Sequence, residues 1–185
     1  MQVPVVEDPQ GSVRCVQWPA GNGRVRHYSR MTTTTPPTSA IAIRPIQAGD
    51  YEAWLPLWNG YLAFYGTAMP VADARHTFDR LCAGERLHGF VAEVGGTVSG
   101  IVHCLFHPST WTPTDYCYLQ DLYVDPACRG AGAGRALIRA VVDFARDRDA
   151  NRVIWLTNED NATARALYDT VARTTGLIQY RISPL

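Results

Sequence analysis

The chain has no lysine: each of its 17 basic side chains is an arginine. This absence excludes Schiff-base catalysis by lysine, a P-loop and the strand lysine of protein kinases. Each of these needs an ammonium group that can lose a proton or hold a phosphate. A chain rich in arginine and alanine but free of lysine also indicates a GC-rich bacterial genome as its source.

The sequence also lacks an excess of charge and a long apolar run. Its 17 basic side chains are balanced by 17 acidic ones, so nothing in the net charge suits a phosphate backbone, and we expect no nucleic-acid partner. No stretch approaches the ~20 apolar residues of a membrane span, and the N-terminus has no basic segment followed by an apolar run. We therefore predict a cytoplasmic protein without a membrane partner.

The five cysteines are an odd number and include no Cys-x-x-Cys pair, and neither they nor the five histidines have the spacing of metal ligands. The simplest interpretation is free thiols in a reducing compartment, and no metal is expected. His103 lies on a predicted strand, where we expect a structural histidine with its hydrogen bonds satisfied.

Residues 1–40 differ from the rest of the chain. Glycine, proline and polar residues interrupt every periodic pattern there, and the segment ends in a run of threonine and proline. We predict a flexible N-terminal tail over 1–40 and one domain over 41–185. Met31 stands just before the threonine and proline run, so translation that begins at Met31 rather than Met1 is an alternative.

From Ile41 onward the apolar pattern becomes regular. Period-2 and short apolar runs predict strands at 41–46, 90–94, 98–106, 116–124, 152–157 and 177–182. Helical spacing predicts a helix that Asp50 caps, followed by helices at 71–83, 132–147 and 162–174. The order is β-α-α-β-β-β-α-β-α-β, which predicts an α/β fold with a mixed, mostly antiparallel sheet flanked by helices.

A glycine-rich turn, Arg-Gly-Ala-Gly-Ala-Gly-Arg, joins a predicted strand to the long helix that follows it. Glycines there let backbone N–H groups and a phosphate approach each other, and the helix N-terminus adds positive potential. A dinucleotide fingerprint needs a last glycine where this chain has Arg135 or Leu137. The pattern that fits is Arg-x-x-Gly-x-Gly at Arg129, Gly132 and Gly134. The structural alternative is that these glycines only end a strand and start a helix.

This turn resembles the coenzyme A pyrophosphate loop of the GNAT superfamily of N-acetyltransferases. The strand before it, Tyr-Leu-Gln-Asp-Leu-Tyr-Val-Asp-Pro from Tyr118, resembles the coenzyme-binding strand of that family. The segment from Asn161 to Tyr168 resembles its Asn-x-x-Ala-x-x-Leu-Tyr segment. The resemblance covers Ile41 to the C-terminus, is nearest to the small polyamine and histone-type branch, and implies a GNAT-like fold with acetyl-coenzyme A (acetyl-CoA) as co-substrate.

The resemblance implies which residues hold acetyl-CoA. The strand lends main-chain groups to the pantetheine arm, the turn binds the pyrophosphate, and an asparagine hydrogen-bonds the pantetheine amides. The matching positions are Leu122, Tyr123, Val124, Arg129, Gly130, Ala131, Gly132, Ala133, Gly134, Arg135 and Asn161. Without the resemblance, Asn161 is interpreted as an ordinary helix N-cap.

The resemblance also implies that Tyr168 donates a hydrogen bond or a proton to the leaving thiolate, whereas an aromatic core residue is the alternative interpretation. An alkylamine has a pKa near 10.4, so its deprotonation near pH 7 costs about 4–5 kcal/mol, and some group must take the proton. Asp121 is the candidate base or cation holder; the alternative is an ion pair with a neighbouring arginine. The branch usually carries glutamate where this chain has Gln120, which orients a substrate or water but accepts no proton.

We predict transfer of an acetyl group from acetyl-CoA to the primary amine of a polyamine or amino-acid-like molecule, by direct attack in a ternary complex. Tyr65, Gln120 and Asp121 are the expected contacts to this acceptor. Acetylation of protein lysine and a non-catalytic acetyl-CoA sensor are the alternatives. Small members of the family often pair through C-terminal strands, so the resemblance also implies a homodimer in which the strand at 177–182 is an exposed edge.

Overall fold

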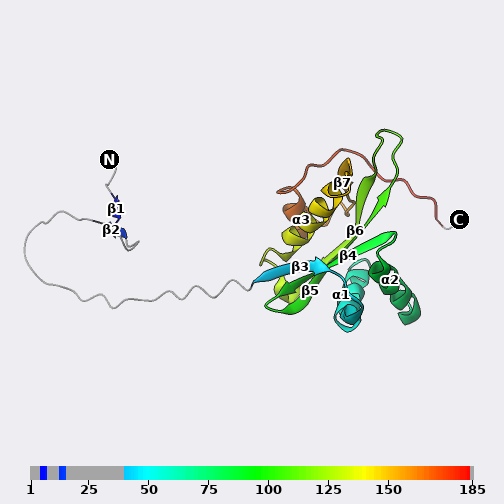
Figure 1. Ribbon diagram of the computed structural model, residues 1–185, viewed down its shortest axis with the longest axis horizontal. Helices are drawn as coiled ribbons and strands as arrows, with labels where there is room; N and C mark the ends of the chain where they lie inside the picture. The colour runs from blue at the N-terminus through cyan, green and yellow to red at the C-terminus, as the bar shows by residue number, and fades with distance from the viewer. Residues whose placement is uncertain (1–4, 8–12, 16–39, 184–185) are drawn as a thin grey trace, which may run out of the picture. The chain divides into compact units, whose positions relative to one another are not determined.

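The computed structural model describes residues 5–7, 13–15 and 40–183 (Figure 1). Strands β1 (Val5–Glu7) and β2 (Val13–Cys15) pair antiparallel and belong to a unit of residues 1–36, distinct from the unit of residues 37–185. The predicted tail over 1–40 lies mostly outside the described residues, as does Met31. Both the tail and the alternative start therefore stay predictions.

The larger unit contains a five-stranded sheet in the order β3-β4-β5-β6-β7. The strands are β3 (Ile41–Pro45), β4 (Leu87–Val94), β5 (Thr97–His107), β6 (Tyr116–Val124) and β7 (Arg152–Ile154). Neighbouring strands are antiparallel except β6 and β7, which run parallel. Gly95 and Gly96 form the predicted two-residue turn of the β4–β5 hairpin, both at positive φ. The predicted mixed, mostly antiparallel α/β fold is confirmed.

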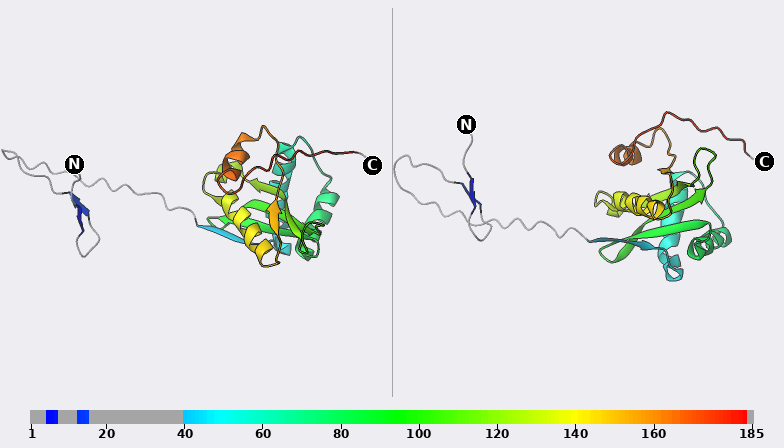
Figure 2. Two further views of the ribbon diagram at one scale, coloured as in Figure 1. Left: turned by 90° about the horizontal axis from the view of Figure 1, so that it is seen from above. Right: turned by 45° about the horizontal axis from the view of Figure 1, so that its top comes forward.

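Helices cover both faces of this sheet (Figure 2). On one face lie α1 (Tyr51–Phe64), which the 3₁₀ turn η1 (Ala48–Asp50) precedes, and α2 (Val71–Ala83). On the other lie α3 (Ala133–Arg146), which follows the 3₁₀ turn η2 (Pro126–Cys128), and α4 (Ala162–Tyr168). Successive side chains along a strand point to opposite faces of the sheet and so pack into different halves of the core. On β5, Ile101 packs toward α1 and α2, whereas Val102 and Cys104 pack toward α3.

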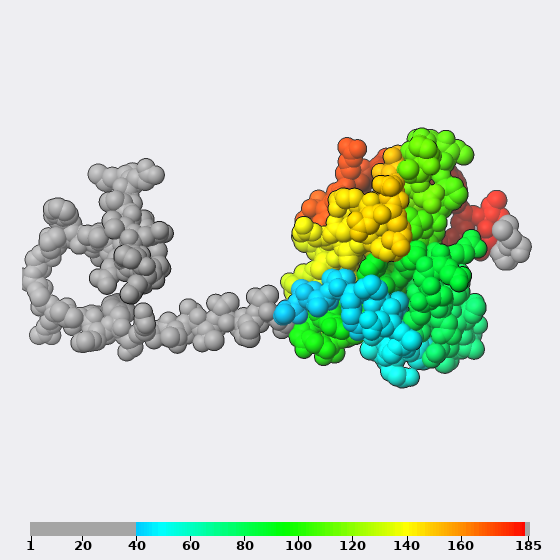
Figure 3. Space-filling view, viewed as in Figure 1, coloured from blue at the N-terminus to red at the C-terminus, as the bar shows by residue number. Residues whose placement is uncertain are grey.

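The C-terminal part of the chain differs from the prediction. The helix predicted over 162–174 ends at Tyr168, the strand predicted over 152–157 ends at Ile154, and residues 177–182 form no strand. Side chains Leu177, Ile178, Tyr180 and Ile182 are 75–87% exposed, and Figure 3 shows this segment in red at the periphery of the unit. An alternating pattern forms a strand only beside a partner edge, and no described strand of this chain lies next to the segment.

An ion-paired cluster ties β3 to the start of α1 and to β4. Arg44 donates to both carboxylate oxygens of Asp50, at 2.7 and 2.8 Å, and to Glu93 at 2.8 Å. Asp50 stands at the N-cap position of α1 but makes no side-chain cap, so the predicted capping role is wrong. Its carboxylate instead accepts from Arg44 and from the Gln47 amide, and the hydrogen bond from Arg44 lowers the pKa of Asp50.

We expect Asp50→Asn to destabilise the fold by about 1–2 kcal/mol at pH 7, because it removes charge-assisted hydrogen bonds of a largely buried group. A lowered folded-state pKa stabilises the protein above the ordinary aspartate pKa. That stability is lost as the pH falls through the folded-state value. The melting-temperature difference from wild type should therefore shrink at about pH 3. Asp79→Asn is the control, since its pair with Arg75 is exposed; a deficit in Asp50→Asn that is equal at both pH values contradicts the electrostatic explanation.

Candidate active site

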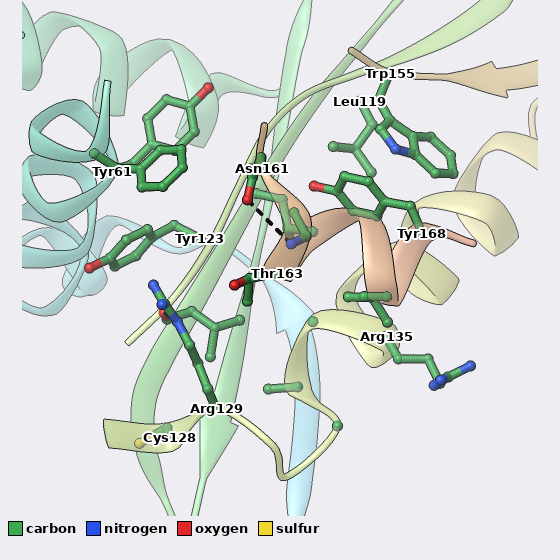
Figure 4. A pocket seen from close by; sticks show the side chains of 18 of the residues that line it. Tyr61, Leu119, Tyr123, Cys128, Arg129, Arg135, Trp155, Asn161, Thr163 and Tyr168 are labelled. Atoms are coloured by element: carbon green, nitrogen blue, oxygen red, sulfur yellow. Dashed lines mark hydrogen bonds between the residues drawn. The ribbon is translucent and has the colours of Figure 1, made fainter. Parts of the chain in front are cut away.

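A cavity of about 420 Å³ lies where the end of α1, the second half of β6, the loop before α3, and α4 meet (Figure 4). This volume falls within the range of small-molecule pockets. In the close-up, Tyr61 and Tyr123 stand on one side, Trp155 and Tyr168 on the other, and Asn161 and Thr163 between them. The cavity therefore brings together groups that are far apart in the sequence.

A β-bulge in β6 determines how the strand contributes to this site. His103 on β5 pairs with Asp121, and the next residue, Cys104, pairs with Leu119, so Gln120 is an extra residue on β6. A bulge of this kind shifts the alternation of side chains by one. Leu119 consequently packs toward α3, whereas Asp121 beyond the bulge meets His103, on the α1 side of the sheet.

The second half of β6 has an open edge on the side of the cavity. The parallel pairing with β7 ends at Ile154 opposite Tyr118, so among the described strands β6 has no neighbour on this side beyond that point. Leu122, Tyr123 and Val124 lie in this half and line the cavity. The main-chain groups along this open edge are suited to an extended ligand that takes the place of a strand.

The glycine-rich turn forms the end of the cavity next to α3. Gly130 and Gly132 have φ of 82° and 97°, and Gly132 is the N-cap of α3. The first main-chain bond of that helix runs from Ala136 to the Gly132 carbonyl, so the amides before it have no partner within the helix. All the predicted turn residues except Ala131 line the cavity: Arg129, Gly130, Gly132, Ala133, Gly134 and Arg135. Arg129 also donates to the Val124 carbonyl and lies over the Tyr123 ring, with 5.7 Å to the centroid.

Asn161 has the local role that its sequence position predicts and also lines the cavity. Its side-chain oxygen accepts from the Ala164 amide at 3.3 Å, which caps α4, and its amide donates to Thr157 at 3.1 Å. The capping interpretation is therefore confirmed. It leaves one side-chain N–H and one oxygen lone pair for a ligand.

Tyr168, the last residue of α4, directs its hydroxyl into the cavity (Figure 4). Its ring packs against Trp155 at a centroid distance of 5.4 Å. Burial raises the pKa of the Tyr168 phenol, and the nearby Tyr65 raises it further. The phenol therefore keeps its proton across the neutral range and past its ordinary value of about 10. Tyr168 is both a packed aromatic and a protonated hydroxyl in the cavity.

The predicted acceptor residues divide into two groups. Tyr65 and Gln120 line the cavity directly, whereas Asp121 is buried behind the lining. The predicted alternative for Asp121, an ion pair with arginine, is wrong: its carboxylate partner is His103, with 3.0 Å between Oδ2 and Nδ1. Burial raises the pKa of Tyr61, and the neighbouring Asp121 carboxylate raises it further. Tyr61 also lines the cavity, so this side chain is next to both the cavity and Asp121.

Several lining residues were not predicted from the sequence. They include Leu119, Cys128, Trp155, Leu156, Thr163 and Leu167. Tyr118 was also missed; burial raises its pKa and the Asp121 carboxylate raises it further, which places this phenol near the same carboxylate. For Tyr118, Leu119, Thr163 and Leu167 the one sequence signal was their position within the two family-like segments. Cys128, Trp155 and Leu156 lie outside both segments, and their residue types alone are ordinary core types.

Within residues 40–183 and the two short strands before them, no group of three or more His, Cys, Asp or Glu side chains is arranged to hold a metal ion. No described helix is long and apolar enough to cross a membrane.

An open-edged strand, a glycine-rich helix N-terminus and a protonated tyrosine around one cavity are the features that the resemblance to the GNAT family predicts. Comparison with protein families agrees: residues 54–171 match the acetyltransferase (GNAT) family. The chain belongs to this family. The predicted enzyme class, an N-acetyltransferase, is thereby confirmed.

Two curated relatives extend the match. D-amino-acid N-acetyltransferase HPA3 of Saccharomyces cerevisiae is 35% identical over 145 residues, which cover 76% of this chain and 89% of the relative. Thialysine N-epsilon-acetyltransferase of Caenorhabditis elegans is 36% identical over 85 residues, 46% of this chain and 52% of that protein. A yeast and an animal relative do not identify the source of this chain, so a bacterial origin stays a prediction.

Solved structures support the fold. Aminoglycoside N-acetyltransferase AAC(6')-Iy, solved in complex with CoA, superposes with a TM-score of 0.68, covering 80% of this chain and 99% of that chain at 18% identity. At this identity the similarity shows the shared architecture alone. The GNAT-like fold expected from the sequence is confirmed by it.

Proposed function

We propose that this chain transfers an acetyl group from acetyl-CoA to the primary amine of a small molecule. One observation carries the proposal: a single cavity joins the glycine-rich turn, the open half of β6, Asn161 and the Tyr168 hydroxyl. The two curated relatives are named for D-amino acids and thialysine, which are small amines. Their names favour a small acceptor over a protein lysine.

The donor is held by the groups that line the cavity from the turn to α4. Gly130, Gly132 and the first amides of α3 receive the pyrophosphate, with Arg129 and Arg135 adding permanent charge. The main chain of Leu122 to Val124 pairs with the pantetheine arm along the open edge of β6. The remaining side-chain N–H of Asn161 serves the pantetheine amides.

The acceptor amine enters from the side of Tyr61, Tyr65 and Gln120. The arginines that line the cavity, Arg129 and Arg135, both belong to the turn at the other end. Phenol rings and the Asp121 carboxylate behind them suit an ammonium group. Asp121 holds this cation and takes its proton, directly or through a water.

The neutral amine then attacks the thioester carbonyl carbon. N–H groups of the Leu122 to Val124 strand stabilise the charge that develops on the carbonyl oxygen. As the C–S bond breaks, the electron pair passes to sulfur, and the Tyr168 hydroxyl donates its proton to the thiolate. The nitrogen of the new amide loses its remaining extra proton, which restores the Tyr168 phenol. Its raised pKa keeps this hydroxyl protonated at neutral pH. Both substrates must be present together, since the amine attacks the thioester directly.

A screen of acceptors tests the proposal. Release of free thiol from acetyl-CoA is followed with polyamines, D- and L-amino acids, thialysine and a lysine-containing peptide. Turnover with a small amine supports it. Turnover with the peptide alone supports the protein-lysine alternative, and binding of acetyl-CoA without thiol release by any acceptor supports the sensor.

Gly132→Val should abolish acetyl-CoA binding, because a branched side chain fills the phosphate space and is strained at φ of 97°. The measurement is the rise in melting temperature on adding acetyl-CoA. Gly96→Val is the control: it imposes similar strain at φ of 83° in the β4–β5 turn, away from the cavity. If acetyl-CoA raises the melting temperature of folded Gly132→Val as much as that of wild type, the glycines of the turn only end a strand and start a helix.

Tyr168→Phe should reduce kcat by about 10²–10⁴-fold while the KM for acetyl-CoA and the melting temperature barely change, because only the hydroxyl is lost. Tyr116→Phe is the matched control. The Tyr116 hydroxyl is buried without a hydrogen-bond partner and lies outside the cavity lining. Near-wild-type turnover in stable Tyr168→Phe rules out the acid role.

A homodimer is the second part of the proposal, formed through the exposed apolar segment of Leu177, Ile178, Tyr180 and Ile182. Four large apolar side chains within six residues are an unusual surface for a monomer. Light scattering at micromolar concentration should give twice the monomer mass. Ile178→Arg with Tyr180→Arg should give the monomer. A monomer mass for the wild-type protein refutes the dimer.

A further inference from the structure

A buried chain of hydrogen bonds joins α1, β5 and β6 behind the acceptor side of the cavity. The Trp54 indole Nε1 donates to His103 Nε2 at 3.0 Å, and His103 Nδ1 lies 3.0 Å from Asp121 Oδ2. The three residues are 0%, 4% and 8% exposed. Water therefore has little access to compete for these contacts, and each donor and acceptor depends on its partner in the chain.

The hydrogen-bond partners of His103 determine which of its ring nitrogens carries the proton. An indole N–H is a donor only, so His103 Nε2 must present a lone pair to Trp54. The ring proton then resides on Nδ1, which donates to the carboxylate. A proton on Nε2 would face the indole N–H, so the Trp54 contact favours the Nδ1–H tautomer. Trp58 lies beside the same ring, with centroids 5.4 Å apart.

The sheet brings this donor to the carboxylate. His103 and Asp121 are register partners, and the bulge at Gln120 turns Asp121 toward the α1 side where the imidazole lies. A carboxylate on a strand otherwise retains side-chain rotation, which misplaces its oxygens with respect to a reacting amine. One fixed N–H on Oδ2 removes most of that freedom.

We propose that His103 and Trp54 are positioning residues for acetyl transfer. Trp54 selects the Nδ1–H form of His103, and that N–H orients the Asp121 carboxylate toward the acceptor amine. The inference rests on the proposed role of Asp121. It extends the function to two buried residues that do not line the cavity.

The other titratable groups around the chain are phenols. Tyr61 from α1 and Tyr118 from β6 lie near Asp121, and burial raises the pKa of both. On β4, the register partner of His103 is Gly89, which brings no titratable side chain. A change of activity with pH that depends on Trp54 therefore reports on His103.

Matched tryptophan variants test the selection of the tautomer. Trp54→Phe removes the donor to Nε2, so His103 can take a second proton and pair with Asp121 as an imidazolium. The kcat/KM for the acceptor should then fall more steeply than in wild type as the pH is lowered from 8.5 to 6. Trp58→Phe makes the same change of ring where the indole N–H is buried without a partner, and should keep the shape of the wild-type profile. A wild-type profile in Trp54→Phe overturns the proposal.

Variants of His103 test the positioning of Asp121. His103→Leu removes the N–H and should lower kcat/KM by roughly 10–100-fold. His103→Asn keeps an N–H near the position of Nδ1 and should recover a large part of that loss. If Asp121→Asn is impaired while His103→Leu is fully active, the positioning inference fails and the proposed function stands. If Asp121→Asn is itself fully active, the role proposed for Asp121 fails.

Nitrogen-15 NMR of the imidazole rings gives an answer that does not depend on turnover. In wild-type protein at neutral pH, His103 should show a protonated Nδ1 and an unprotonated Nε2, with the signals assigned by their loss in His103→Asn. Observation of that pattern supports the proposal. An Nε2–H form or an imidazolium at neutral pH overturns it.

Discussion

The extra residue at Gln120 decides which side chains of β6 face each layer of the protein. Before the bulge, Cys117 and Leu119 pack toward α3; after it, Leu122 and Val124 do so. A regular strand would keep position 121 on the face of 117 and 119, and a carboxylate there would be buried in an aliphatic core at high cost. The bulge instead brings Asp121 opposite His103 and leaves Gln120 in the cavity lining. The donor half and the acceptor half of the site thus depend on one insertion in one strand.

Elements that a short stretch of sequence specifies by itself were predictable. The bounds of α2 and β6 agree with the apolar pattern, and the Gly95-Gly96 turn and the glycine-rich turn lie where their backbone requirements predict. Family-like spacing added Asn161 and Tyr168 to the same cavity. For these residues a short segment of chain specifies both conformation and neighbours.

Features that depend on which of several possible partners a side chain or a strand edge meets were not predictable. Asp50 is a residue type that favours the N-cap position, yet its carboxylate accepts hydrogen bonds from Arg44 and from the Gln47 amide instead. Residues 177–182 alternate like a strand, but strand formation depends on a partner edge that the pattern does not describe. His103 was expected to have partners for its hydrogen-bonding nitrogens, and it has them. The sequence does not show that these partners are the Trp54 indole and the Asp121 carboxylate.

The early end of β7, opposite Tyr118, leaves half of β6 without a strand beside it in the described sheet. On the proposed function, the pantetheine arm of the donor supplies the missing partners, so a metabolite completes the architecture. Occupancy and folding free energy are then linked, and the supply of acetyl groups sets the fraction of molecules that open transiently. Because proteases act on opened molecules, the lifetime of the enzyme would follow the availability of its own substrate.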